Sequence, residues 1–88
     1  MAIKVFLPAG WRRLGVDCSV WTSEATNLTE LMDQLCGRWP GLQAQLTPPD
    51  ISIVTLFLNG QIVHPDHWGQ QTLKQGDQID VLLPISGG

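Results

Sequence analysis

One stretch of this chain has the spacing of an amphipathic helix, and it lies between two groups of strand-like segments. Leu28, Leu31, Met32 and Leu35 recur at the i, i+3, i+4, i+7 positions that form one apolar helix face, and Trp39 continues the stripe. A chain with one helix and several strands can bury that face only against a sheet. The sequence therefore predicts an α+β fold in which a single helix lies across one face of a sheet.

Both ends of this helix are marked in the sequence. Asn27 is a good N-cap residue, and Glu30 follows three residues later, as in a capping box with Asn in the cap position. Pro40 and Gly41 cannot continue a helix. The predicted helix therefore begins after Asn27 and ends before Pro40.

Strand-like segments precede and follow the helix, and they alternate in the two-residue period of a strand. The first carries Ile3, Val5 and Leu7 on one face, and the second carries Val16, Cys18 and Val20. The predicted strands are residues 2–7, 16–21, 51–58, a short strand from residue 61, and a last strand carrying Ile79, Val81 and Leu83 on one face. The order is therefore β-β-α-β-β-β, with the second strand antiparallel to the first.

Three details refine this topology. Asn59-Gly60 between apolar runs predicts a tight hairpin, because a type I′ turn needs positive φ at both central residues. The last strand is a candidate for the centre of a mixed sheet, parallel to the first. Residues 8–15 are expected to form a loop or wide hairpin, because they contain Pro8, Gly10 and Gly15.

Composition limits what such a chain can do. Its 88 residues make one domain, its net charge is −3, and its five basic residues are scattered. Without a basic stripe we expect no nucleic-acid partner, whereas an acidic surface suits a basic protein partner. No apolar segment approaches the roughly 18 residues that span a bilayer, and the first residues lack a signal-peptide pattern, so no membrane partner and a cytoplasmic location are expected.

The chain ends in Gly87-Gly88 directly after an apolar run. Glycine loses the most conformational entropy on ordering and adds nothing to a core. At average usage, two glycines end a chain by chance in roughly 0.5% of cases. A frayed end or a cloning remnant is the structural alternative to a functional tail.

Three stretches resemble the ThiS/MoaD family of sulfur carriers, which are ubiquitin-like β-grasp proteins. The ending LLPISGG is similar to that family's Pro-x-x-Gly-Gly tail, and residues 27–42 are similar to the helix of the molybdopterin-synthase small subunits. Residues 58–82 are similar to the thiazole-pathway carriers, with a Trp after a polar loop and a Gly-Asp turn before the last strand. The first half is longer than in the compact thiazole-pathway carriers, so the sequence combines features of two subgroups.

This resemblance implies a β-grasp domain at 1–83 and a flexible tail at 84–88. It implies that the Gly88 carboxylate is adenylated by an E1-like enzyme using ATP and Mg²⁺ and becomes a thiocarboxylate. The protein would be a carrier rather than an enzyme and would bind no cofactor or metal itself. Its partners would be that enzyme, a sulfur donor such as a cysteine desulfurase or rhodanese, and a sulfur-accepting synthase, and the free carrier would be a monomer.

The tail residues would each have a part in this chemistry. Gly87 and Gly88 lack a Cβ, so they could thread a narrow channel in a partner. Pro84 would limit the tail's movement where the strand ends, Ile85 would anchor it, and Ser86 would set its reach. These four residues, 84–87, are the predicted partner-binding positions, and Gly88 is the reacting one.

Several functions remain open on these residues. The sulfur acceptor could be the thiazole of thiamine, the dithiolene of molybdopterin, or a sulfur-containing amino acid or secondary metabolite, and the protein could be the small subunit of a complex such as molybdopterin synthase. The alternatives to a carrier are a ubiquitin-like modifier of lysines and a non-catalytic β-grasp interaction module. If the gene continues past Gly88, a processing protease is implied.

Two other groups of residues, the histidines with Asp66 and the cysteines, could suggest a metal or redox site, but a structural role is expected for each. His64, Asp66 and His67 are expected to be a solvated loop, because Pro65 and the lack of further ligands argue against a metal site. Cys18 and Cys36 lack metal or redox spacing and are expected to be packed, reduced thiols, although two cysteines also permit a disulfide.

Apolar residues on an exposed sheet face would dock the partners. The sequence does not say which face the helix covers, and the candidates are Leu56, Phe57, Leu58 and Leu82. Of the four tryptophans, Trp39 is expected at the helix end, and Trp68 and Trp21 are expected to plug the core. Trp11, beside Arg12 and Arg13, is the one suspected of touching a partner, although packing in the core or loop is the more usual role of a tryptophan.

Overall fold

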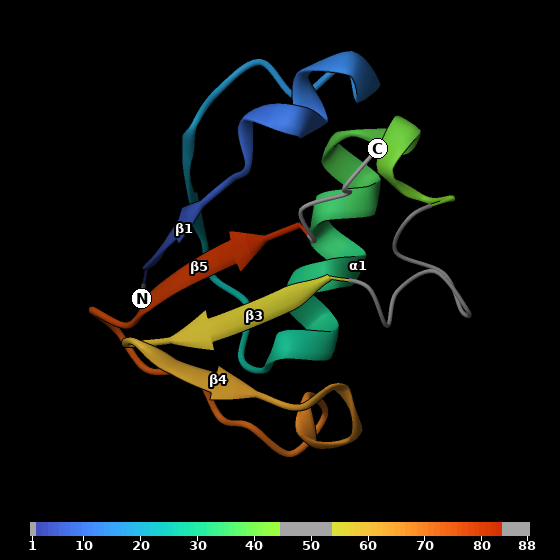
Figure 1. Ribbon diagram of the computed structural model, residues 1–88. Coiled ribbons are helices and arrows are strands. Elements are labelled where there is room, and N and C mark those ends of the chain that lie inside the picture. Colours follow the sequence, from blue (N-terminus) through green and yellow to red (C-terminus); the bar gives the residue numbers. More distant parts are fainter. Residues whose placement is uncertain (1, 45–53, 84–88) are drawn as a thin grey trace.

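The computed structural model describes residues 2–44 and 54–83. A five-stranded sheet with strand order β2-β1-β5-β3-β4 is covered on one face by helix α1 (Figure 1). The strands are β1 (Ile3–Phe6), β2 (Val20–Ser23), β3 (Thr55–Leu58), β4 (Gln61–Val63) and β5 (Gln78–Leu82), and α1 is Leu28–Arg38. The α+β class and the order β-β-α-β-β-β are confirmed.

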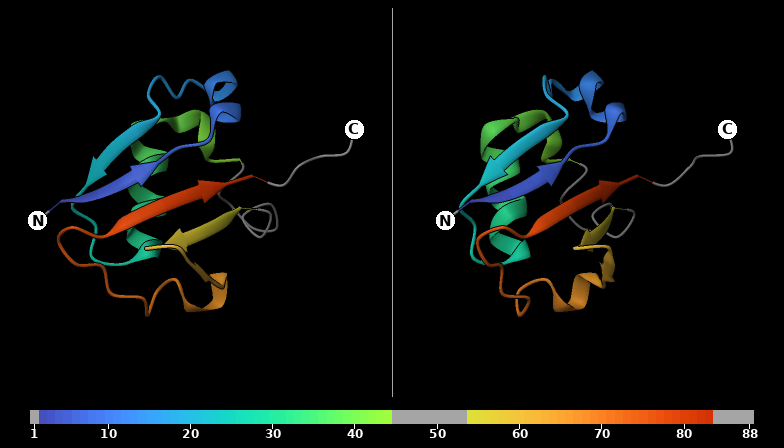
Figure 2. Two further views of the ribbon diagram at one scale, coloured as in Figure 1. Left: turned by 60° about the vertical axis from the view of Figure 1, so that its left-hand side comes forward. Right: turned by 90° about the vertical axis from the view of Figure 1, so that its left-hand side faces the viewer.

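The last strand occupies the centre of the sheet, as predicted. β5 is parallel to β1, and its register places Val5 beside Ile79 and Phe6 beside Asp80. Its other neighbour, β3, is antiparallel. β1–β2 and β3–β4 are antiparallel hairpins at the two sides, so β5 joins them into one sheet (Figure 2).

The first strand is shorter than predicted, and the second one is displaced; residues 51–53 of the predicted third strand lie outside the described residues. Residues 16–21 were expected to alternate with Val16, Cys18 and Val20 on one face, but β2 begins at Val20. Residues 17–19 do not continue a strand, so the alternation restarts, and Val20 is 44% exposed on the face that α1 does not cover. The expectation that Val20 shares the buried face is therefore wrong, whereas Val16 is buried.

The core forms between α1 and the covered face of the sheet. Buried side chains of α1 are Leu28, Leu31, Met32 and Leu35. They belong to the same apolar cluster as the inward residues of the central strands, which are Ile3, Val5, Leu56, Ile79 and Val81. Trp39 and Trp68 are each 4% exposed, as a helix-end residue and a core plug should be, and Trp21 is partly buried.

A short 3-10 helix, η1 (Ala9–Leu14), replaces the predicted loop after β1. Its Trp11 is completely buried, so the expected packing role is confirmed and the suspected partner contact is wrong. Pro8, Gly10 and Gly15 predicted a loop here. The residues between them instead form a helical turn that directs the Trp11 indole into the core. η1 also lies against η2 (Pro40–Leu42), where a Cβ at Gly41 would overlap the Leu14 carbonyl oxygen.

The hairpin turn between β3 and β4 has the predicted conformation. Asn59 and Gly60 have φ of 51° and 87°, the left-handed values that a type I′ turn requires. The Asn59 side chain also fastens the turn to the start of β5: its Oδ1 accepts from Gln78 N at 2.9 Å and its Nδ2 donates to Asp77 Oδ1 at 3.0 Å.

The N-terminus of α1 is capped as predicted, with one difference. Asn27 Oδ1 accepts a hydrogen bond from Glu30 N at 2.8 Å. The Glu30 carboxylate reaches back to Thr26 rather than to Asn27, accepting from Thr26 N and Thr26 Oγ1, each at 3.2 Å. The reciprocal bond therefore closes one residue earlier than in a standard capping box.

Replacing this cap should destabilise the protein measurably. Asn27→Ala leaves the Glu30 N–H without its acceptor, so we expect a loss of about 1 kcal/mol in unfolding free energy and a Tm lower by roughly 4–8 °C. Asn27→Ser retains an acceptor oxygen and should remain close to the original Tm. Equal Tm values for the two variants in thermal denaturation would show that the cap contributes nothing.

Candidate functional site

The predicted reacting tail, Pro84 to Gly88, lies outside the described residues, so the site is described up to its attachment point. Leu83 is the last described residue and follows directly after β5. It is partly buried and packs against the core cluster. A Cβ at Gly10 would come within 3.2 Å of Leu83 Cδ1, so η1 packs closely against Leu83.

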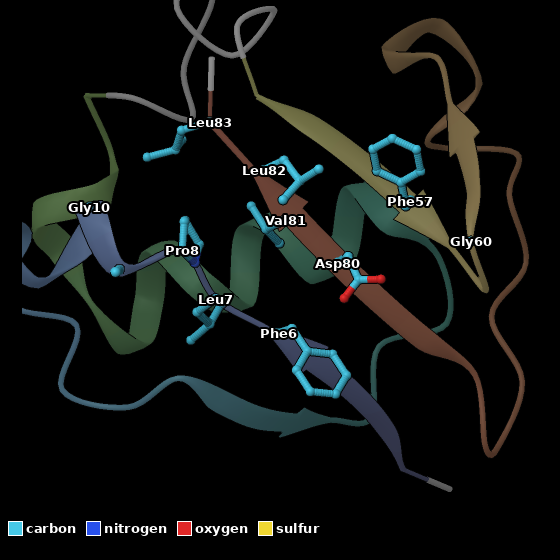
Figure 3. A pocket seen from close by; sticks show the side chains of 11 residues that line it. Phe6, Leu7, Pro8, Gly10, Phe57, Gly60, Asp80, Val81, Leu82 and Leu83 are labelled. Atoms are coloured by element: carbon cyan, nitrogen blue, oxygen red, sulfur yellow. The ribbon is translucent and has the colours of Figure 1, made fainter. Parts of the chain in front are cut away.

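A groove of about 810 Å³ lies beside this attachment point (Figure 3). It is lined by residues 6–10, by Phe57 and Gly60, and by residues 80–83. The groove is therefore built from the ends of β1 and β5, from β3 and its turn, and from the start of η1. Its lining is mainly apolar, and Asp80 is its acidic residue.

The face of the sheet that α1 leaves open carries the polar and apolar side chains that alternate with the core. On β5, Ile79 and Val81 are buried, Asp80 is half-buried, and Leu82 is 49% exposed. On β3, Leu56 is buried, whereas Phe57 is half-buried. We call this outward surface, with its groove, the open face.

Two of the four predicted docking residues lie on this face. Phe57 and Leu82 line the groove. Leu56 is fully buried and Leu58 packs against the core, so the prediction that they dock partners is wrong. Each of them alternates with Phe57 along β3 and therefore points toward α1.

Sequence reasoning missed four further residues of the open face. Phe6 and Asp80 line the groove, and Val20 and Ile62 are 44% and 67% exposed beside it on the edge strands. The alternation along β1 and β5 could have indicated Phe6 and Asp80. Their proximity depends on β1 and β5 being neighbours, which the sequence only suggested.

The two histidines lie in the turn after β4, away from this groove. His64 and His67 are exposed, and their ring centroids are 6.3 Å apart. His64 Nδ1 accepts from Asp66 N at 3.3 Å and lies 3.5 Å from Asp66 Oδ2. Within residues 2–44 and 54–83, no three His, Cys, Asp or Glu side chains are arranged to hold a metal ion.

Both cysteines are free and half-buried against the core, which confirms the packed-thiol reading. Burial, together with the nearby Asp33 carboxylate, raises the pKa of the Cys36 thiol. Cys36 therefore stays protonated at neutral pH and is a poor nucleophile. In the described part of the chain, no helix is both long enough and apolar enough to cross a membrane.

A family comparison decides what kind of chain this is. The model of the ThiS family matches residues 11–88, which is most of the sequence. The chain belongs to the ThiS family. Members of this family are small carrier proteins, so membership supports a sulfur-carrier role.

Solved structures with the same fold match this ThiS-family protein over nearly its full length. SAMP1 from Haloferax volcanii superposes with a TM-score of 0.78 at 17% identity, covering 100% of both chains. The Amycolatopsis orientalis BexX/CysO complex contains a chain with a TM-score of 0.81 at 19% identity, covering 98% of this chain and 99% of that one.

A third neighbour comes from another complex. A chain of the complex of subunits 1 and 2 of molybdopterin-converting factor from Helicobacter pylori has a TM-score of 0.63 at 24% identity, covering 100% of both chains. These likenesses identify the fold of this ThiS-family protein as the ubiquitin-like β-grasp. No curated protein matches the sequence.

Proposed function

We propose that this ThiS-family protein carries sulfur as a thiocarboxylate on Gly88. The observation that supports this proposal most strongly is the extent of the family match, which runs to residue 88 and so includes the whole Gly-Gly ending.

The chemistry requires only the main-chain carboxylate of the carrier. One Gly88 carboxylate oxygen attacks the α-phosphorus of ATP, pyrophosphate leaves, and an acyl-adenylate forms. Hydrosulfide then attacks the acyl carbon, AMP leaves with the oxygen, and a thiocarboxylate remains. The E1-like partner supplies Mg²⁺ and the catalytic groups, and a cysteine desulfurase or rhodanese supplies the sulfur; a persulfide donor additionally needs a thiol reductant.

The described structure supports the proposal through the attachment point of the tail. β5 is bonded on both sides, to β1 and to β3, and Leu83 packs against the core and Gly10. Leu83, the attachment point of the tail, is therefore held at the end of the central strand. A partner that binds the rigid domain would hold this attachment point at a fixed distance from its own active site.

The acceptor is a synthase for the thiazole of thiamine or for a molybdopterin-type dithiolene. The sequence combines motifs of the thiazole-pathway carriers with motifs of the molybdopterin-synthase small subunits, which supports both classes of acceptor. The structural neighbours named above support the fold alone. The open face is where such partners would dock in turn, because it combines exposed apolar side chains with a groove whose lining includes Leu83, the attachment point of the tail.

Intact-mass measurement tests the proposal. The protein is incubated with the E1-like enzyme of its host, ATP, Mg²⁺ and sulfide, and a second sample omits ATP. We expect a mass increase equal to one oxygen replaced by one sulfur, only with ATP. Adducts on lysines of other proteins would instead indicate a modifier, and an unchanged mass in both samples would leave a non-catalytic interaction module.

A further inference from the structure

One row of outward side chains crosses the open face from edge to edge. Strand register pairs Val20 with Phe6, Phe6 with Asp80, Asp80 with Phe57, and Phe57 with Ile62. Four of the five are apolar, and the single charge stands in the middle, on β5. Figure 3 shows Asp80 between Phe6 and Phe57.

Asp80 has no partner within the described residues. Asp80 is half-buried, and its carboxylate makes no hydrogen bond or ion pair there. Lys4 lies on the same face, but the strand register places it beside Gln78, one outward position away. Phe6 on β1 and Phe57 on β3 flank β5, so their Cα atoms are about 10 Å apart, two strand spacings, which leaves room for one inserted side chain above Asp80.

This arrangement fits a basic side chain better than an apolar one. A partner surface that covers the row removes water from Asp80, and an unpaired buried carboxylate is costly. A guanidinium can bind the carboxylate through two hydrogen bonds and stack its plane on a phenyl ring at the same time. The acidic net charge of −3 favours a basic partner as well.

We propose that Asp80, held between Phe6 and Phe57, is the docking point for an arginine of the adenylating enzyme. This inference rests on the proposed function for the identity of the partner, while the chemistry of the contact comes from the open face itself. Asp80 acts in recognition and does not touch the reacting Gly88 carboxylate.

The same charge argues against two other occupants. A second copy docked through this face about a twofold axis near its centre would bring two Asp80 carboxylates together without a counter-charge. A fold-back of the chain's own residues 84–88 would bring the terminal carboxylate toward Asp80. Both arrangements would juxtapose like charges in a desolvated groove.

A binding series with the purified adenylating enzyme tests this. Asp80→Asn keeps the size of the side chain and removes its charge, so we expect Kd to rise at least tenfold, and Asp80→Lys should raise it at least a hundredfold. The matched control is Asp33→Asn, which makes the same charge change at an exposed position of α1 on the opposite side of the sheet and should stay within twofold. The Tm of each variant confirms that the fold is intact.

Added salt provides a second readout. When the salt concentration is raised, the Kd of the wild type should increase by a larger factor than the Kd of Asp80→Asn. Salt screens the ionic contact of Asp80, and the variant lacks that contact. Equal Kd values for Asp80→Asn and Asp33→Asn, or no binding of the wild type, would overturn the docking proposal. A dimer that Asp80→Asn tightens would assign the face to a second copy and overturn it as well.

The two proposals fail separately in this design. If the wild type gains sulfur but Asp80→Asn binds normally, the carrier function stands and the docking point is wrong. If Asp80→Asn weakens binding but the wild type never gains sulfur, the docking point stands and the carrier chemistry is wrong.

Discussion

A protein that ends at Gly87 is expected to gain no detectable sulfur under conditions that load the full chain. Removing Gly88 moves the terminal carboxylate back by one residue, about 3.5 Å along an extended chain. Since a misplacement of about 1 Å can cost roughly 100-fold in rate, the initial loading rate should fall by at least that factor. The measurement is intact mass against time.

Folding provides the control for this deletion. The described core is formed by side chains between Ile3 and Val81, so the Tm should not change. A second variant with one glycine added after Gly88 displaces the carboxylate forward and should also load poorly. Normal loading of the shortened chain would mean that Gly88 is not required for sulfur loading, and the proposal of a thiocarboxylate on Gly88 would fail.

The largest loss of stability is expected from Trp11→Ala. Trp11 is completely buried in the contact between η1 and the core, and truncating a buried tryptophan to alanine costs about 3–5 kcal/mol. For a domain of this size that corresponds to a Tm lower by roughly 12–40 °C. Thermal and urea denaturation followed by circular dichroism measure both quantities.

A substitution at an exposed apolar residue provides the control for Trp11→Ala. Ile62→Ala removes apolar atoms from a side chain that is 67% exposed, so its unfolding free energy should change by about 0.5 kcal/mol or less. A Trp11→Ala protein as stable as Ile62→Ala would mean that the indole is not part of the core. Such a result would instead support Trp11 as a residue that contacts a partner.

The fold was largely predictable because its signals are local. The apolar face of α1, the Asn27 cap and the left-handed pair at Asn59 and Gly60 are each specified by neighbouring residues. η1 was not predictable in this way, since a short 3-10 helix with two adjacent arginines resembles an exposed loop. What decides its structure is the burial of Trp11, which depends on residues far along the chain.

The open face was predictable only in part for the same reason. Alternation along one strand separates Phe57 from Leu56, but it does not say which of the two faces α1. The row containing Asp80 exists because β5 lies between β1 and β3, which brings residues 6, 57 and 80 side by side. Such a juxtaposition is a property of the topology and is absent from any short segment.

The central position of β5 also sets the order in which this domain can be assembled on the ribosome. The β1–β2 and β3–β4 hairpins are both synthesised before β5, and their inner edges have no strand partner until residues 78–82 emerge. Unpaired edges of this kind invite pairing with other nascent chains. Completion of the sheet must therefore follow synthesis of its last strand, so a polypeptide interrupted before β5 lacks the strand that joins the two hairpins into one sheet.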